Sequence, residues 1–68
     1  MTNEELKARL ILMGYTVSHA AYIKDYLKFT LHSNIPAIYF NCNNDYWEIY
    51  TNSNTWGEAT PNEVWKSL

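Results

Sequence analysis

Three segments of the chain alternate polar and apolar residues with a period of two, which is the spacing of a β-strand. They are residues 26–31 (YLKFTL), 38–41 (IYFN) and 46–51 (YWEIYT). Because successive strand side chains point to opposite faces, the aliphatic residues of these segments share one face of a sheet. Four tyrosines share the other face, namely Tyr26, Tyr39, Tyr46 and Tyr50. One face can be covered by the chain's own helices, and the other can receive another molecule.

The second and third segments predict a β-hairpin. Pro36 opens its first strand, where the missing backbone N–H does no harm. Asn43 and Asn44 predict a two-residue turn, because asparagine tolerates positive φ. The resulting register opposes Cys42 to Asp45, Phe40 to Trp47, Tyr39 to Glu48, Ile38 to Ile49, and Ala37 to Tyr50. This register keeps the aliphatic residues and the tyrosines on separate faces, which supports the hairpin.

The chain begins with a helix signal. Thr2 followed by Glu5 fits the capping box, in which each side chain bonds the other residue's backbone N–H. Gly14 is typical of the residue that follows a helix. The predicted apolar stripe of this helix consists of Leu6, Leu10 and Met13, widened by Ile11 and Leu12. We expect Met13 to fill the core.

The chain ends with a second, shorter helix. Thr60 and Glu63 make another capping box, and Pro61 suits the first helical position. The apolar side of this helix is formed by Val64, Trp65 and Leu68. The polar residues and glycine of 52–57 predict a loop before it, and this loop contains Trp56.

Residues 15–32 fit two patterns. As strands, residues 16–23 alternate, and a turn at Lys24-Asp25 leads into the strand 26–31. As a helix, the segment has Ser18 as its N-cap. The stripe of that helix consists of Ile23, Leu27, Thr30 and Leu31. We favour the strands, because YLKFTL has a clean period of two and β-prone residues.

These elements predict one α+β domain that spans residues 1–68. It has an N-terminal helix, a three- to four-stranded antiparallel sheet and a short C-terminal helix, with both helices on one face. The alternative places one helix on each face, which would cover the tyrosines. The α-β-β-β-α order is similar to that of double-stranded RNA-binding domains. Those domains carry a basic cluster at the start of the last helix, where this chain has TPNE at 60–63, so the resemblance implies no RNA-binding activity.

Composition and charge narrow the classes of partner. Hydrophobic residues make up 47% of the 68-residue chain, which is enough for a globular core. A chain this short buries only about 60% of its unfolded surface, which leaves little room for an enclosed active site. Five basic and seven acidic residues give a net charge of −2. Strong binding to phosphate backbones requires several Lys and Arg, so the charge argues against nucleic acid as a partner.

Localisation follows from what the chain lacks. It contains no apolar run of the roughly 20 residues that span a bilayer, and no signal-peptide pattern. Its single cysteine excludes an intramolecular disulfide and suits a reducing compartment. We therefore expect a cytoplasmic protein with no membrane partner.

No motif indicates catalysis, a metal or a cofactor. His19, expected to be partly buried, and His32, expected to be exposed, do not form a ligand pattern with Cys42. A nucleophilic cysteine would need an electropositive setting, whereas Asp45 lies nearby in sequence. Glu48 has Lys28 available on the same face as an ion-pair partner. We expect a protein without enzymatic activity.

The tyrosines then indicate binding. Tyr and Trp supply large rigid surfaces with a polar tip and are enriched at binding hot spots. We predict a protein-binding module, such as a small inhibitor or modulator, whose partner is another protein or a second copy of itself. The predicted contact residues are Tyr26, Lys28, Tyr39, Tyr46, Glu48, Tyr50 and Trp56. The rival is a single-stranded nucleic-acid-binding domain that stacks bases on the tyrosines. The size of the chain also suits a phage or mobile-element protein that modulates a host protein.

Overall fold

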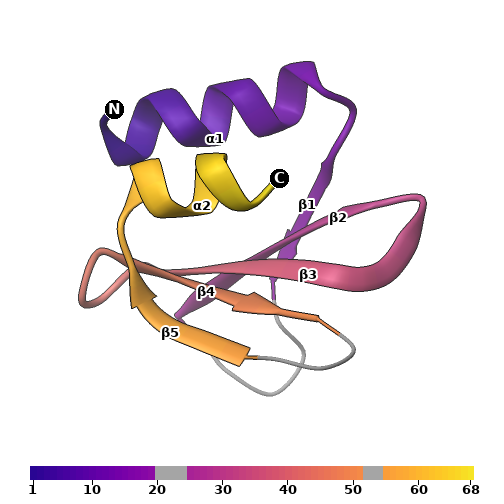
Figure 1. Ribbon diagram of the computed structural model, residues 1–68. Coiled ribbons are helices and arrows are strands. Elements are labelled where there is room, and N and C mark those ends of the chain that lie inside the picture. The colour runs from indigo at the N-terminus through magenta and orange to yellow at the C-terminus, as the bar shows by residue number, and fades with distance from the viewer. Residues whose placement is uncertain (20–24, 52–54) are drawn as a thin grey trace.

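The computed structural model describes residues 1–19, 25–51 and 55–68 (Figure 1). In chain order, the elements are α1 (Asn3–Leu12), β1 (Thr16–His19), β2 (Tyr26–Leu31), β3 (Ser33–Asn41), β4 (Tyr46–Tyr50), β5 (Thr55–Ala59) and α2 (Pro61–Ser67). The five strands form one antiparallel sheet in the order β1-β2-β3-β4-β5. The α+β fold with a helix at each end is therefore confirmed, and the sheet has one strand more than the three to four predicted.

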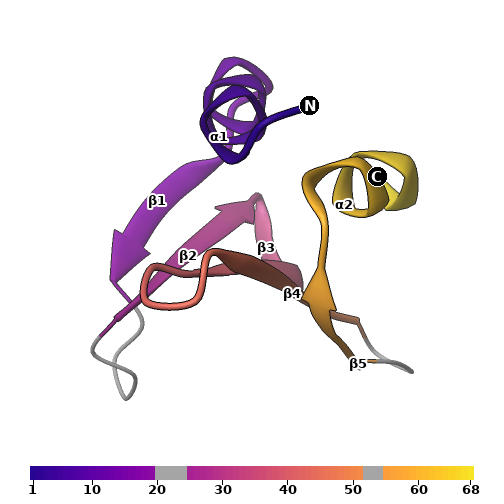
Figure 2. The same cartoon turned by 90° about the vertical axis from the view of Figure 1, so that its left-hand side faces the viewer.

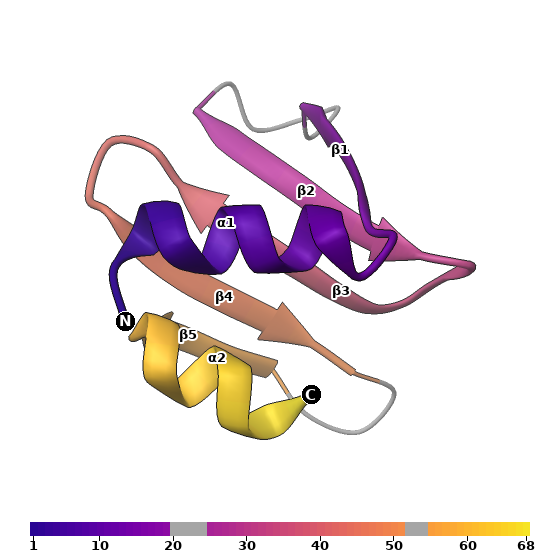
Figure 3. The ribbon, with the colours of Figure 1, turned by 90° about the horizontal axis from the view of Figure 1, so that it is seen from above.

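Both helices lie on the same face of the sheet. Figures 1 and 2 show α1 and α2 side by side above the strands, and Figure 3 shows them from above. The arrangement with one helix on each face is therefore excluded. No helix of the described residues lies over the other face of the sheet.

The strand interpretation of residues 15–32 is confirmed where the structure describes it. β1 pairs with β2 in an antiparallel register that sets Thr16 opposite Thr30 and His19 opposite Leu27. The predicted turn at Lys24-Asp25 falls partly on residues 20–24, which lie outside the described residues. All four residues of β1 are exposed, so His19 is not partly buried as expected. β1 is an edge strand, and only one neighbour shields it.

The predicted hairpin register is confirmed for the pairs from Ala37–Tyr50 to Phe40–Trp47, and Asn41 faces Tyr46 beyond them. The predicted turn was too short, because residues 42–45 form a four-residue turn in which the Asp45 N–H donates to the carbonyl of Asn41 at 2.9 Å. The Asn41 side-chain oxygen also accepts from the backbone N–H groups of residues 43 and 44, at 2.9 and 3.1 Å. This asparagine side chain stabilises the longer turn, so Cys42 and Asp45 are not a strand pair. β3 also begins before Pro36.

The loop predicted for residues 52–57 is wrong from Thr55 onward, and its residues 52–54 lie outside the described residues. Residues 55–59 form β5, in which Trp56 pairs with Ile49 and Ala59 pairs with Trp47. The register shifts between these two pairs, and Glu58 has a positive φ of 55°. The irregularity removes the period-two alternation from the sequence of this strand, and the pattern therefore indicated a loop.

Both capping boxes are present. The backbone N–H of Glu5 donates to Thr2 Oγ1 at 3.1 Å, and that of Glu63 donates to Thr60 Oγ1 at 3.3 Å. The hydrogen bonds that the two glutamates accept from the N-cap threonines lower the pKa of each carboxyl group. Gly14 follows α1 with a φ of +101°, as predicted.

The core lies between the helices and the sheet and centres on Trp47. The Trp47 indole is fully buried and packs against Phe40 and Phe29, with ring centroids 4.8 and 5.6 Å apart. Its Nε1–H donates to the side-chain oxygen of Asn3 at 2.9 Å, which satisfies its one polar group. The other large residues of this core are Leu6, Leu10, Tyr15, Ile38, Ile49 and Val64.

The predicted stripe of α1 is only partly buried. Leu6 and Leu10 face the sheet, whereas Ile11, Leu12 and Met13 are 56%, 87% and 46% exposed. At about 100° of rotation per residue, Leu12 points roughly 200° away from Leu10. Met13 is the C-cap and therefore does not fill the core. In the described part of the chain, no helix is long and apolar enough to cross a membrane.

Candidate protein-binding face

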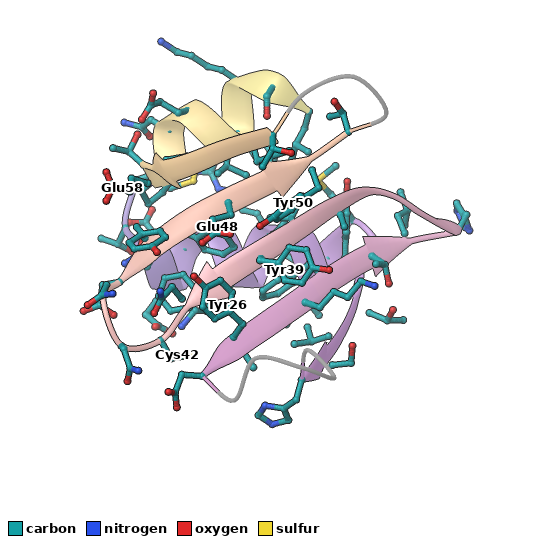
Figure 4. The ribbon with its side chains drawn as sticks, turned by 90° about the horizontal axis from the view of Figure 1, so that it is seen from below. Tyr26, Tyr39, Cys42, Glu48, Tyr50 and Glu58 are labelled. Atoms are coloured by element: carbon teal, nitrogen blue, oxygen red, sulfur yellow. The ribbon has the colours of Figure 1, made fainter. Side chains whose placement is uncertain are left out.

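The sheet surface opposite the helices carries the predicted tyrosines. We call this surface the tyrosine face, and it consists of Tyr26, Lys28, Tyr39, Tyr46, Glu48 and Tyr50. All six residues are half-buried. Figure 4, which looks at this surface from below, shows Tyr26, Tyr39, Glu48 and Tyr50 grouped over the middle strands, with the helices behind the sheet. The structure thus brings together six of the seven predicted contact residues.

Strand register places these side chains in rows across the sheet. One row contains Lys28, Tyr39 and Glu48, which are register partners on β2, β3 and β4. A second row contains Tyr26, Asn41 and Tyr46 on the same three strands. Because paired residues project on the same side, the predicted alternation is sufficient to assemble the face.

Two tyrosine hydroxyls hold the Glu48 carboxylate. Tyr26 Oη donates to Glu48 Oε2, and Tyr50 Oη donates to Glu48 Oε1, both at 2.6 Å. Distances this short are typical of charge-assisted hydrogen bonds. Both rings are therefore fixed in orientation, and a carboxylate on the sheet surface has two polar partners from its own chain.

The network extends to Asn41 and Tyr46. Asn41 Nδ2 donates to Tyr26 Oη at 3.0 Å, and the hydroxyls of Tyr26 and Tyr46 are 3.2 Å apart. Tyr26 has one hydroxyl hydrogen, which goes to Glu48, so Tyr46 is the donor to Tyr26. The buried Asn41 thus connects the tyrosine face to the turn at residues 42–45.

Tyr39 lies at the centre of the face. Its ring makes edge contacts with Tyr26 and Tyr50, with centroids 6.3 and 5.0 Å apart. Lys28 Nζ lies over the Tyr39 ring, 5.9 Å from its centroid. Such contacts restrain the rings, and they leave the outer surface of Tyr39 accessible.

The expected ion pair between Lys28 and Glu48 is wrong. Across the described residues, the ion pair present is Lys7–Glu4, and Lys28 forms none. Glu48 instead accepts hydrogen bonds from the hydroxyls of Tyr26, on β2, and of Tyr50, on its own strand.

The hydrogen bonds to Glu48 also determine the protonation of the tyrosines. They raise the pKa of Tyr50 to about 12 and raise the pKa of Tyr26 further above its usual value. Both hydroxyls remain protonated near neutral pH and act as donors.

The seventh predicted residue, Trp56, lies on β5 and not in a loop. Sequence reasoning missed Asn41, which links the tyrosines to the turn. Its position at a strand end before two further asparagines, on the same side of β3 as Tyr39, was the available signal.

A groove of about 370 Å³ lies between the end of the sheet and α2. It is lined by Ile49, Gly57, Ala59, Glu63, Lys66 and Ser67. Glu63 already accepts a hydrogen bond from the backbone of Thr60 in the capping box. Ser67 Oγ donates to the carbonyl of Val64 at 2.8 Å, so this second polar side chain also bonds the backbone beside it.

The other polar candidates remain apart. Cys42, His19 and His32 are all exposed, which confirms the expectation for His32. Within residues 1–19, 25–51 and 55–68, no group of three or more His, Cys, Asp or Glu side chains could hold a metal ion. The tyrosine face is therefore the candidate site with the most organised side chains.

Comparison with known proteins adds no template for this site. No protein-family model matches the chain, and no curated protein or solved structure is significantly similar to it.

Proposed function

We propose that this chain is a non-enzymatic protein-binding module that uses the tyrosine face as its contact surface. One observation carries the proposal: both helices pack on the same side of the sheet (Figure 2), and strand register places the four tyrosines on the other side, where no helix of the described residues covers them. A small inhibitor or modulator of another protein would act through such a surface.

The side chains of the tyrosine face are already held in place in the free chain, which lowers the free-energy cost of binding. Association costs free energy when mobile side chains become fixed, by about 0.5–1.5 kcal/mol for each one. Tyr26 and Tyr50 are already held by Glu48, and Tyr39 is held between their rings. Much of that ordering cost is therefore met within the folded chain, which favours a tight contact.

The hydroxyl partners support the same conclusion. Burying a polar group without a hydrogen bond is unfavourable. The hydroxyls of Tyr26, Tyr46 and Tyr50 have partners on the tyrosine face itself. A protein partner can exclude water from them without leaving a donor unsatisfied.

The charges of the face favour a protein over a single-stranded nucleic acid. Lys28 is its one basic residue, and the Glu48 carboxylate would repel phosphates. If the chain instead bound single-stranded nucleic acid, its affinity for an oligonucleotide should rise clearly as the salt concentration falls. Weak and salt-independent retention of a fluorescent oligonucleotide is the result we expect.

Capture from a cell lysate on immobilised chain tests the proposal. Tyr39→Ala removes the central ring, and Leu12→Ala removes an exposed apolar side chain on α1 as the matched control. Both variants should stay folded by circular dichroism. We expect proteins that bind the parent and the control to be lost from Tyr39→Ala, and equal capture by all three chains would contradict the proposal.

The proposal includes a cytoplasmic site of action. The exposed Cys42 supports it, since a free thiol suits a reducing compartment. An origin in a phage or mobile element fits the size of the chain, and it would make the partner a host protein.

A further inference from the structure

We propose that the tyrosine face binds a second copy of the chain, face to face, with Lys28 of each copy against Glu48 of the other. The proposal rests on the proposed function, in which the tyrosine face is a protein contact surface, and it identifies one partner. A foreign protein that uses the same face would compete with this dimer.

The two charged residues of the tyrosine face lie on opposite sides of its central tyrosine. Lys28, Tyr39 and Glu48 form one row across three adjacent strands. Neighbouring strands are about 4.8 Å apart, so the two charged residues lie at equal distances on either side of Tyr39. The row is therefore positive at one end, aromatic in the middle and negative at the other end.

This order is self-complementary under one symmetry operation. In a two-fold dimer both copies use the same patch, and each residue is exchanged with its counterpart. A two-fold axis parallel to the strands, midway between two facing sheets and over Tyr39, brings each Lys28 opposite the second copy's Glu48. The strands of the two sheets are then roughly aligned, as in β-sandwiches.

Both charged groups can form further polar contacts. In the described part of the chain, Lys28 makes no ion pair and contacts the Tyr39 ring. Each Glu48 oxygen accepts one tyrosine hydroxyl, whereas a carboxylate has about four acceptor positions. The ammonium group of a second copy can therefore bind Glu48 without breaking the tyrosine network.

Charge exchange between two variants tests the arrangement. In Lys28→Glu both ends of the row are negative, and in Glu48→Lys both ends are positive. Analytical ultracentrifugation should show that the parent dimerises and that each variant alone has a dimer dissociation constant raised by about tenfold or more. An equimolar mixture of the two variants should recover a dimer, because opposite charges then meet at both contacts.

Lys66→Glu is the matched control for charge. It makes the same change at an exposed position on α2, on the other side of the sheet. This variant should dimerise like the parent. Dimerisation that weakens equally in Lys66→Glu and Lys28→Glu would show a general charge effect and would overturn the proposed contact.

Zero-length carbodiimide cross-linking of the unchanged chain is a second test, which does not depend on whether Glu48→Lys folds. The reagent joins an amine to a carboxylate in direct contact, and mixing ¹⁴N- and ¹⁵N-labelled chains identifies links between copies. We expect a Lys28–Glu48 product with mixed labels. A monomeric parent, the absence of this product, or a mixture of well-folded variants that stays monomeric overturns the inference. The lysate capture by Tyr39→Ala tests the proposed function separately.

Discussion

The two faces of the sheet are built from the same strands and have opposite relations to water. On the helix face, Phe29, Ile38 and Trp47 are fully buried beneath α1 and α2. On the tyrosine face, the side chains of the alternate positions are half-buried, and their hydroxyls bond one another and Glu48. One face is closed by the chain itself, and the other has its polar groups paired in advance of any partner.

The difference shows how a short chain can keep an aromatic sheet face in contact with water. A purely aliphatic second face would expose a large apolar patch, which promotes aggregation. Tyrosine provides comparable ring area, and the Glu48 network satisfies the hydroxyls. The surface can therefore remain in water in the free chain and can also lose that water when a partner binds.

The largest expected effect comes from truncating the central side chain of the core, on the face of the sheet that the helices cover. Trp47→Ala should lower the free energy of unfolding by about 3–5 kcal/mol, because it leaves a large cavity among Phe29, Phe40 and the helices. In a chain of 68 residues this loss can remove the folded state. Thermal melting followed by circular dichroism measures it, and an unchanged melting temperature would refute the description of the core.

The next largest effect is expected at high pH, where ionisation of the tyrosines breaks the hydrogen bonds of the tyrosine face. The pKa of Tyr50 is about 12 in the folded chain and about 10 for an unperturbed tyrosine, and that of Tyr26 is also raised. A raised pKa means that the protonated hydroxyl stabilises the fold. This contribution is complete below pH 10 and is lost as the pH rises from about 10 to 12.

We expect a loss of about 1 kcal/mol over that range, since solvent weakens hydrogen bonds at half-exposed sites. The Glu48→Gln variant serves as the comparison, because a neutral acceptor should let both tyrosines ionise closer to pH 10. Absorbance at 295 nm follows the ionisation, and chemical denaturation at each pH follows the stability. Identical titrations of the parent and the variant would contradict the role of Glu48.

A smaller effect concerns the helices that close the first face. Thr60→Ala removes the N-cap of α2 and should cost about 1 kcal/mol. Amide hydrogen exchange across residues 61–67 should accelerate, while exchange in β2 and β3 should change little. If α2 exchanged at the parental rate, the capping box would not be stabilising this helix.

The sequence predicted both faces because their pattern is local. Period-two alternation in β2, β3 and β4 was enough to obtain the register from Ala37 opposite Tyr50 to Phe40 opposite Trp47. The capping boxes could also be predicted from the sequence, because their two residues lie three positions apart. Six of the seven candidate site residues followed from these local rules.

The remaining features depend on interactions that no short pattern contains. The irregularity at Glu58 hides the alternation of β5, and the Asn41 side chain lengthens the turn after β3. The Glu48 network requires two tyrosines from different strands to reach the same carboxylate, so Lys28 was the partner expected from charge alone. Ile11 and Leu12 are exposed because the orientation of α1 on the sheet leaves them outside the core.

Tyr39 and Phe40 offer the most direct test, because they are adjacent on β3 and belong to opposite faces. The measurement is the free energy of unfolding of Tyr39→Ala and of Phe40→Ala, by chemical denaturation of dilute samples. An uncovered tyrosine face predicts a loss of about 3–5 kcal/mol for Phe40→Ala and only about 1 kcal/mol for Tyr39→Ala. Equal losses at the two positions would mean that the chain covers both faces itself, and they would contradict the proposed binding surface.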